Sequence, residues 1–109
     1  MSYLFLIQFE ERYSNNLAKE LARCSHVVTE VHTILEFERL LSIRKIDPDF
    51  VLIDLSSDGP EIWRNVDRIQ RTFADKQIYP TIIGYSRIYR GAEMRLRAAK
   101  RGIRFVYED

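Results

Sequence analysis

Acidic and hydroxyl side chains follow apolar segments of this sequence at places where they could meet. Asp54 ends the apolar run Phe50–Ile53, Glu10 and Glu11 come shortly after the first apolar run, and Ser86 follows the fourth. A strand buried on both faces reads as a continuous apolar run, so an acid directly after one lies at the edge of a sheet. Asp54 is therefore the first candidate for chemistry. The alternatives are a turn cap for Asp54, an N-cap for Ser86, and a favourable helix-start charge for the two glutamates.

Other chemistries lack their sequence motifs. No GxGxxG follows the first apolar run and no GxxxxGK[ST] occurs, which argues against dinucleotide binding and NTP hydrolysis. Cys24 is the single cysteine, which excludes an intramolecular disulfide, and we expect it to be a small core residue. His26 and His32 have no cysteine or histidine partner at metal-binding spacing. A small α/β enzyme or ligand binder is thus the least favoured class.

Length and composition indicate one ordinary globular domain. The chain has 109 residues, 46% of them hydrophobic, and a formal net charge of +1, so overall charge indicates no particular partner. The first apolar run is too short for a signal peptide or a membrane span. We therefore expect a single domain over residues 1–109, located in the cytoplasm and away from membranes.

Apolar runs alternate with helical patterns along the whole chain. The runs are Tyr3–Ile7, His26–Val31, Phe50–Ile53, Tyr79–Tyr85 and Ile103–Tyr107. Each segment between them carries apolar residues at helical spacing. Thr33 and Glu36 form a capping box at the start of the second helix, and Gly102 is a stop signal after the fourth.

Specific side chains are expected to pack the helices onto the sheet. The fourth helix, at about 88–101, should bury the stripe Ile88, Ala92, Leu96 and Ala99. Trp63 lies beside the apolar stripe of the third helix and should be partly buried.

This order predicts a doubly wound α/β domain with a five-stranded parallel sheet in the order 2-1-3-4-5, the flavodoxin-like arrangement. The usual helix after the last strand is missing. The sheet face shared with the first helix should then be half uncovered, which favours an interface. We favour a domain taken from a longer regulator, with a homodimer as the second interpretation.

The stretch "DPDFVLIDL" resembles the third strand of bacterial response-regulator receiver domains, where a Pro-Asp turn precedes an apolar strand that ends in the phosphoaccepting aspartate. "TIIGYS" and "KRGIRFVYE" extend the resemblance over the whole chain except the last helix. The resemblance implies that Asp54 accepts a phosphoryl group from a histidine kinase or phosphotransfer protein, assisted by Mg²⁺. It also implies that Ser86 is the switch hydroxyl and Phe105 the switch aromatic, and that no enzymatic activity exists beyond self-catalysed phosphotransfer.

Three departures make the resemblance that of an atypical receiver. Gln8-Phe9 stands where receivers carry two metal-binding acids, and the candidate Mg²⁺ ligands are then Glu10, Glu11 and Asp54. The lysine after the fifth strand is replaced by Glu108 or Tyr107, and the turn after Asp54 is short. A phosphate of roughly −1.5 to −2 charge would meet acids there without the lysine. The alternative function is a phosphorylation-independent interaction or dimerisation domain.

A basic segment offers a partner surface. Residues 87–104 contain seven cations and one acid, and Arg90, Arg97 and Arg101 are predicted to share the solvent face of the fourth helix. Receivers signal through the region of the fourth helix and fifth strand, so the resemblance implies that the Arg87–Tyr107 region contacts an attached or separate effector. A solvated helix face is the alternative. No aromatic platform accompanies the cations, so direct nucleic-acid binding is not expected.

Overall fold

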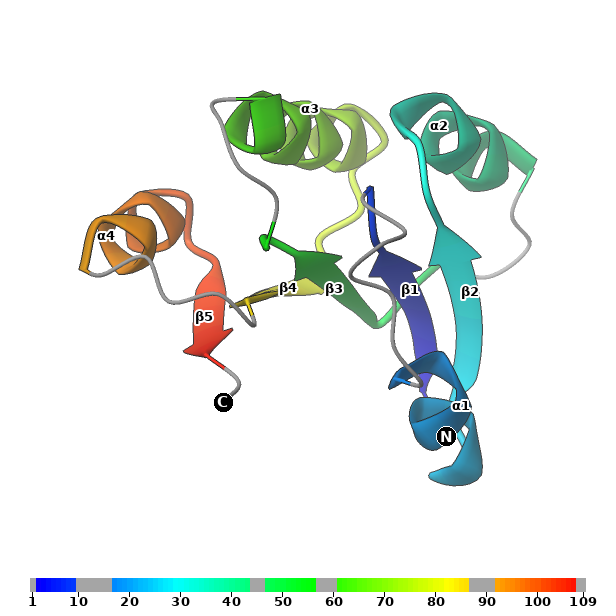
Figure 1. The fold of residues 1–109 in the computed structure, drawn as a ribbon. Coiled ribbons are helices and arrows are strands. Elements are labelled where there is room, and N and C mark those ends of the chain that lie inside the picture. Colours follow the sequence, from blue (N-terminus) through cyan, green and yellow to red (C-terminus); the bar gives the residue numbers. More distant parts are fainter. Residues whose placement is uncertain (1, 10–16, 44–46, 57–60, 87–91, 108–109) are drawn as a thin grey trace.

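The computed structural model describes residues 2–9, 17–43, 47–56, 61–86 and 92–107. Strands and helices alternate throughout this part of the chain (Figure 1). The strands are β1 (Tyr3–Ile7), β2 (Val27–Val31), β3 (Phe50–Asp54), β4 (Thr81–Ser86) and β5 (Arg104–Tyr107). The helices are α1 (Leu17–Arg23), α2 (Ile34–Ile43), α3 (Glu61–Asp75) and α4 (Ala92–Lys100). All five strands are parallel and the sheet order is β2-β1-β3-β4-β5, which confirms the predicted doubly wound fold.

The core lies on the sheet face that α2, α3 and α4 cover. Strand pleating places alternate residues on opposite faces, so Phe5 and Ile7 of β1 share this face with Val51 and Ile53 of β3. Phe37 of α2 joins the layers through its ring. It meets Phe5 edge-on with centroids 6.2 Å apart and also meets Phe73 of α3 at 5.2 Å. Such edge-to-face pairs add about 0.5–1.5 kcal/mol beyond the buried area.

The opposite sheet face is covered much less evenly. Among the described helices, α1 alone lies on this side, near β1 and β2 (Figure 1). Leu6 of β1 is fully buried there, Leu52 and Ile83 are partly buried, and Val106 of β5 is 52% exposed. The predicted half-uncovered face is therefore present in the described part of the fold.

Local signals set most helix ends where the sequence predicts them. Thr33 Oγ1 accepts the backbone N–H of Glu36 at 3.0 Å, which is the first half of a capping box. The Glu36 carboxylate accepts the N–H of His32, the residue before the cap, at 3.3 Å. Gly102 follows α4 with a φ of 70°, a conformation that glycine adopts without steric cost. The Ile103 N–H then bonds the Ala98 carbonyl at 3.0 Å, which closes the helix.

The predicted stripe of the fourth helix is wrong. Met94 and Ala98 are its buried residues, whereas Leu96 is 61% exposed and Ala92 and Ala99 are exposed. Ile88 lies outside the described residues. Several alanines in this arginine-rich segment allow more than one stripe at helical spacing, and only the position of β5 selects the buried one.

Three smaller predictions also need correction or refinement. Cys24 is exposed rather than part of the core, because the chain turns away directly after α1 with Ser25 at a φ of 67°. Tyr79 lies before β4 and is 79% exposed, since Pro80 has no N–H for a sheet ladder. Trp63 lies beside the α3 stripe as expected, but it is buried rather than partly buried.

Candidate functional site at the carboxyl edge of the sheet

A row of three polar side chains lies at the carboxyl ends of the central strands. Asp54 of β3 pairs with Tyr85 of β4, and Ile7 of β1 pairs with Ile53. Gln8 follows Ile7 and is therefore level with Asp54. Residues paired in this way point to the same face of a parallel sheet, here the sparsely covered face that carries α1. The fold thus gathers Gln8, Asp54 and Tyr85 at the edge where ligands bind open α/β sheets.

The Asp54 carboxylate is buried but only half satisfied. Its side chain is 3% exposed, and Oδ1 accepts the backbone N–H of Ser56 at 2.8 Å, which holds the turn after β3. Oδ2 is buried and has no hydrogen-bond partner among the described residues. An unsatisfied buried acceptor of this kind costs about 1–3 kcal/mol, so the site is poised for a donor, a cation or a covalent bond at Oδ2.

Gln8, directly after β1, and Tyr85 of β4 lie on either side of β3 and are hydrogen-bonded to each other. The Gln8 Nε2 donates to the Tyr85 hydroxyl at 3.0 Å, and both side chains are buried. Because β3 lies between β1 and β4, this hydrogen bond spans the strand that carries Asp54. Gln8 Oε1 is buried without a hydrogen-bond partner in the described part of the chain. Two unpaired oxygens therefore belong to neighbouring positions of one sheet edge.

His32 fixes the strand end that carries Gln8. Its Nδ1 lies 3.0 Å from the Gln8 carbonyl oxygen, and the Gln8 N–H donates to the Val31 carbonyl at 2.9 Å. The sequence indicated only an ordinary strand-end histidine. The sequence placed Tyr85 at the end of an apolar run that borders the expected crevice, and the sheet register brings it level with Asp54.

The proposed switch residues lie near this row on the other face of the sheet. Ser86 is fully buried and comes one residue after Tyr85, so pleating turns it toward the opposite face. Phe105 of β5 is level with Gly84 and is partly buried against the core on that same face. Glu10, Glu11, Arg87, Arg90 and Glu108 lie outside the described residues.

A magnesium ion, which the resemblance implies, can be tested against the oxygen atoms at this edge. Mg²⁺ is held by one or two carboxylates together with waters and other oxygens. Asp54 Oδ2 and Gln8 Oε1 are unpaired oxygens of the required kind, so the donor set fits a hard divalent cation. The described residues contain no group of three His, Cys, Asp or Glu side chains that could hold a metal.

The predicted basic surface is partly committed to packing within the domain. Arg101 donates to both Asp67 carboxylate oxygens, at 2.6 and 3.2 Å, and its guanidinium lies 4.8 Å from the Trp63 ring centroid. It follows α4 and holds that helix against α3, instead of facing solvent as expected. Arg97 remains on the exposed surface and pairs with Glu93 at 2.7 Å.

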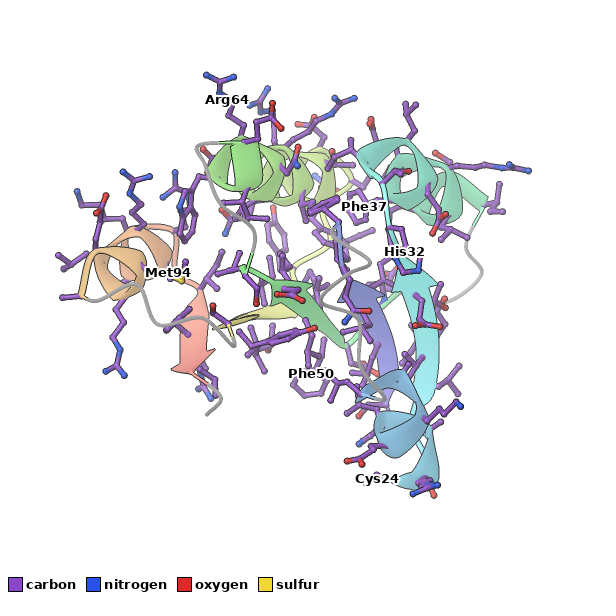
Figure 2. All side chains as sticks on the ribbon, in the orientation of Figure 1. Cys24, His32, Phe37, Phe50, Arg64 and Met94 are labelled. Atoms are coloured by element: carbon purple, nitrogen blue, oxygen red, sulfur yellow. The ribbon has the colours of Figure 1, made fainter. Side chains whose placement is uncertain are left out.

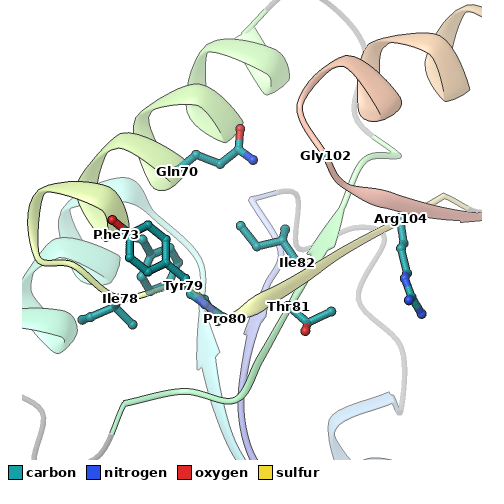
Figure 3. A pocket seen from close by; sticks show the side chains of 9 residues that line it. All are labelled: Gln70, Phe73, Ile78, Tyr79, Pro80, Thr81, Ile82, Gly102 and Arg104. Carbon is teal, nitrogen blue, oxygen red and sulfur yellow. The ribbon is translucent and has the colours of Figure 1, made fainter.

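A surface pocket lies far from this edge, at the amino ends of β4 and β5. Its volume is about 390 Å³ (Figure 3). Phe73, Ile78 and Ile82 provide apolar lining, and Tyr79 and Arg104 also line it. Asp54 lies at the opposite ends of the strands, so this pocket is separate from the candidate site.

In the described part of the chain, no helix is long and apolar enough to cross a bilayer. Figure 2 shows the charged side chains that surround the helices.

No family model and no curated protein matches the chain. Solved structures do match over almost its full length. The non-phosphorylated HemR receiver domain from Leptospira biflexa superposes with a TM-score of 0.71 at 24% identity, covering 99% of this chain and 82% of that one. A response regulator receiver protein from Burkholderia phymatum gives 0.76 at 18% identity, with coverages of 99% and 83%.

A response regulator protein from Burkholderia pseudomallei, solved with a phosphorylated aspartic acid, a calcium ion and citrate, gives a TM-score of 0.74 at 17% identity. The match covers 99% of this chain and 60% of that one. Likeness at these identities establishes the fold, so the chain has the fold of response-regulator receiver domains. The predicted resemblance is confirmed at that level.

Proposed function

We propose that this chain is a receiver-like domain of a two-component or phosphorelay system, that Asp54 is its phosphoacceptor, and that it signals through protein–protein contacts. The observation that carries the proposal is the Asp54 carboxylate. It is buried at the carboxyl end of the central strand of a receiver fold, with one oxygen unpaired among the described residues.

In this proposal, Asp54 acts as the nucleophile. Ser56 N–H holds Oδ1, which leaves Oδ2 to attack the phosphorus of a phosphohistidine on a histidine kinase or phosphotransfer protein. The Oδ2–P bond forms as the P–N bond breaks, and the leaving imidazole takes up a proton. The product is an acyl phosphate on Asp54. A divalent cation bound at this edge would supply positive charge against the phosphate oxygens.

Two features argue that the domain is atypical. Gln8 contributes no negative charge at the position where receivers carry an acid, and Glu108 or Tyr107 stands where they carry a lysine. Glu10 and Glu11 remain proposed Mg²⁺ ligands beside Asp54. Ser86 and Phe105 remain the proposed switch pair, since both lie on the α4 side of the last two strands.

The test is a phosphate mimic applied to the intact chain. Mg²⁺ with beryllofluoride, or acetyl phosphate, should shift the backbone amide signals of Asp54, Ser56 and Ser86 in NMR spectra. The Asp54→Asn variant should show no such shifts. If the wild-type spectrum stays unchanged at saturating mimic, Asp54 does not accept phosphate under these conditions. The alternative, a phosphorylation-independent interaction domain, then replaces the first proposal.

The output surface is proposed to lie in the Arg87–Tyr107 region. Arg97 is exposed on α4, and Arg90 belongs to the same basic segment, whereas Arg101 contributes by fixing α4 in place. Replacing Arg90 and Arg97 by Glu should weaken binding to an acidic effector by at least about tenfold, because both contacts would become repulsive. Replacing Arg64 and Arg71 on α3 is the matched control. Equal binding by both double variants would contradict this surface.

The chain is proposed to be one domain of a longer regulator that works in the cytoplasm, with Mg²⁺ as its cofactor. It makes no direct contact with nucleic acid or membrane. A homodimer through the uncovered sheet face is the second arrangement.

A further inference from the structure

The surface pocket at the amino ends of β4 and β5 is large enough for a small molecule. Its volume of about 390 Å³ falls within the range of roughly 300–1,000 Å³ that is usual for ligand pockets. The residues that line it come from the end of α3, the start of β4 and the turn that leads into β5 (Figure 3). Asp54 lies at the carboxyl edge of the sheet, so a ligand here would occupy a second site.

The floor of the pocket is apolar and is held in place by the core. Phe73 is 2% exposed and Ile78 is 6% exposed, and both belong to the core cluster. Ile82 is partly buried and packs against the same cluster. The Ile78 N–H donates to the Phe73 carbonyl at 2.9 Å, which ties the residue after the helix to α3. A ligand on this floor would therefore meet side chains that are already ordered, and binding would cost little further entropy.

Tyr79 adds an exposed aromatic ring to the lining. It is 79% exposed, although the backbone on both sides of it is anchored. Ile78 is bonded to α3 on one side, and on the other the Thr81 N–H donates to the Asp49 carbonyl at 3.1 Å. Pro80, between them, has a restricted φ. Tyrosine on a restrained backbone offers a large amphipathic contact at small entropic cost, which makes it frequent in binding surfaces.

Gln70 supplies a polar group to the pocket. Its Nε2 donates to the Arg101 carbonyl at 2.8 Å, and because a carbonyl oxygen only accepts, this bond fixes which end of the amide is the nitrogen. The amide oxygen, Oε1, accepts no hydrogen bond from the described residues. The side chain extends from α3 toward Gly102, where an added Cβ would meet no atom within 4 Å (Figure 3). A ligand in the pocket that carries an N–H or O–H group can therefore donate to Gln70.

The charges around the pocket favour a neutral ligand. Among the described lining residues there is no acid, and Arg104 is the one cation. Arg104 is level with Ile83, and Thr81 precedes Ile82 on β4. Pleating therefore places the Arg104 and Thr81 side chains on the sheet face opposite to Ile82, as Figure 3 shows. A charged ligand on the floor would lose hydration without gaining a charged partner, which is unfavourable.

We infer that this pocket binds a small neutral aromatic molecule with one N–H or O–H donor, of the phenol or indole class. Phe73, Ile78 and Ile82 contact the apolar part of the ligand. Tyr79 packs against its ring, and Gln70 Oε1 accepts its donor. The inference goes beyond the proposed function, because the pocket and Asp54 lie at opposite edges of the sheet.

The first experiment adds indole to the intact, isotope-labelled protein. NMR titration should give saturable shifts of the Gln70 side-chain NH₂ signals and of the backbone amides of Tyr79 and Gly102. The Asp54 amide should stay in place. Shifts that never saturate, or that are equally large at exposed apolar residues such as Leu96, mean nonspecific hydrophobic contact only and overturn the inference.

A matched pair of probes tests the hydrogen bond to Gln70. N-methylindole has nearly the shape of indole but no N–H. The preference of the protein for indole over N-methylindole should fall about twofold to tenfold in Gln70→Met, which removes the acceptor. A ratio of the two affinities cancels any effect of the variant on the packing around Arg101. An unchanged ratio would show that Gln70 does not accept the donor and would contradict the inference.

The contribution of Tyr79 is measured with two variants. Tyr79→Ala should weaken indole binding about twofold to tenfold through the lost ring contact, whereas Tyr79→Phe keeps the ring and should bind like the wild type. Leu96→Ala removes another exposed apolar side chain, on α4, and is the matched control. If Tyr79→Ala and Leu96→Ala bind indole equally well, Tyr79 is not part of the site and the assigned lining is wrong.

Failure of this inference and failure of the proposed function give different results. Saturable indole binding without any response to beryllofluoride retains the pocket and removes the phosphoacceptor. A beryllofluoride response without saturable indole binding retains the phosphoacceptor and removes the pocket. Asp54→Asn should bind indole like the wild type. Loss of indole binding in that variant would place the probe at the carboxyl edge of the sheet and overturn the inference.

Discussion

At the residue scale, the Asp54 edge keeps two buried oxygens unpaired at some expense of stability. Asp54 Oδ2 and Gln8 Oε1 have no hydrogen-bond partner among the described residues, and each carries an unfavourable desolvation cost. Proteins accept such costs where a ligand satisfies the atoms. By contrast, Leu55, which directly follows Asp54, is a fully buried and tightly packed apolar residue.

A side chain at Gly84 on β4 should force Leu55 to shift. A Cβ atom at Gly84 would lie 2.5 Å from Leu55 Cδ1, too close for any real contact. Gly84→Ala should therefore lower the free energy of unfolding by about 1–3 kcal/mol through overpacking. Urea denaturation followed by circular dichroism measures the loss. The added variant Leu55→Ala should make Gly84→Ala nearly neutral, whereas strict additivity of the two changes would show that the steric argument is wrong.

At the element scale, polar side chains add to the core packing that α3 and α4 share. Arg101 reaches from the end of α4 to Asp67 and Trp63 on α3, and Gln70 Nε2 donates to the Arg101 carbonyl at 2.8 Å. These polar contacts of Arg101 therefore supplement Met94 and Ala98, which belong to the same core cluster as the buried residues of α3.

Arg101→Met should test the contacts of Arg101 with α3. The variant loses the two hydrogen bonds to Asp67 and the cation–π contact with Trp63, but it keeps an apolar stem over the ring. Because the pair is partly exposed, we expect a loss of only about 1 kcal/mol in the free energy of unfolding, together with a shift in Trp63 fluorescence.

Arg97→Met is the comparison for this change, since Arg97 pairs with Glu93 on an exposed helix surface. Its effect should be about 0.5 kcal/mol or less. Similar losses for the two variants would contradict a special role of Arg101 in holding α4.

At the scale of the whole molecule, the two sheet faces differ in how well they are covered. Three helices pack on the face that contains the aromatic core, whereas α1 is the one described helix on the other face (Figure 1). Apolar exposure on that face increases toward β5, where Val106 is about half exposed. Such a surface favours association, either with another part of a longer chain or with a second copy.

Val106→Glu should reduce self-association with little effect on the stability of the fold. An exposed edge residue contributes little to the core, so the free energy of unfolding should change by about 0.5 kcal/mol or less. Self-association, measured by analytical ultracentrifugation over a range of concentrations, should decrease. Val106→Ile is the control and should preserve it. A wild-type chain that stays monomeric at every concentration tested would contradict the dimer through this face.

The sequence by itself determined the order of elements, because apolar runs of strand length alternate with helical spacing throughout the chain. It also identified Asp54, since an acid that ends a fully apolar strand must lie at a sheet edge, and it located the caps at Thr33 and Gly102. These signals are local, so they can be read within a few neighbouring residues.

Only the tertiary structure decided which side chains meet. Register across β1, β3 and β4 brings Gln8 and Tyr85 level with Asp54, and no local pattern encodes that alignment. The buried side of α4 likewise depended on the position of β5, so the stripe through Leu96 was predicted incorrectly. Arg101 faces Trp63 and Asp67 for the same reason: contacts between residues distant in sequence are selected by packing of the whole sheet and its helices, not by the periodicity of one segment.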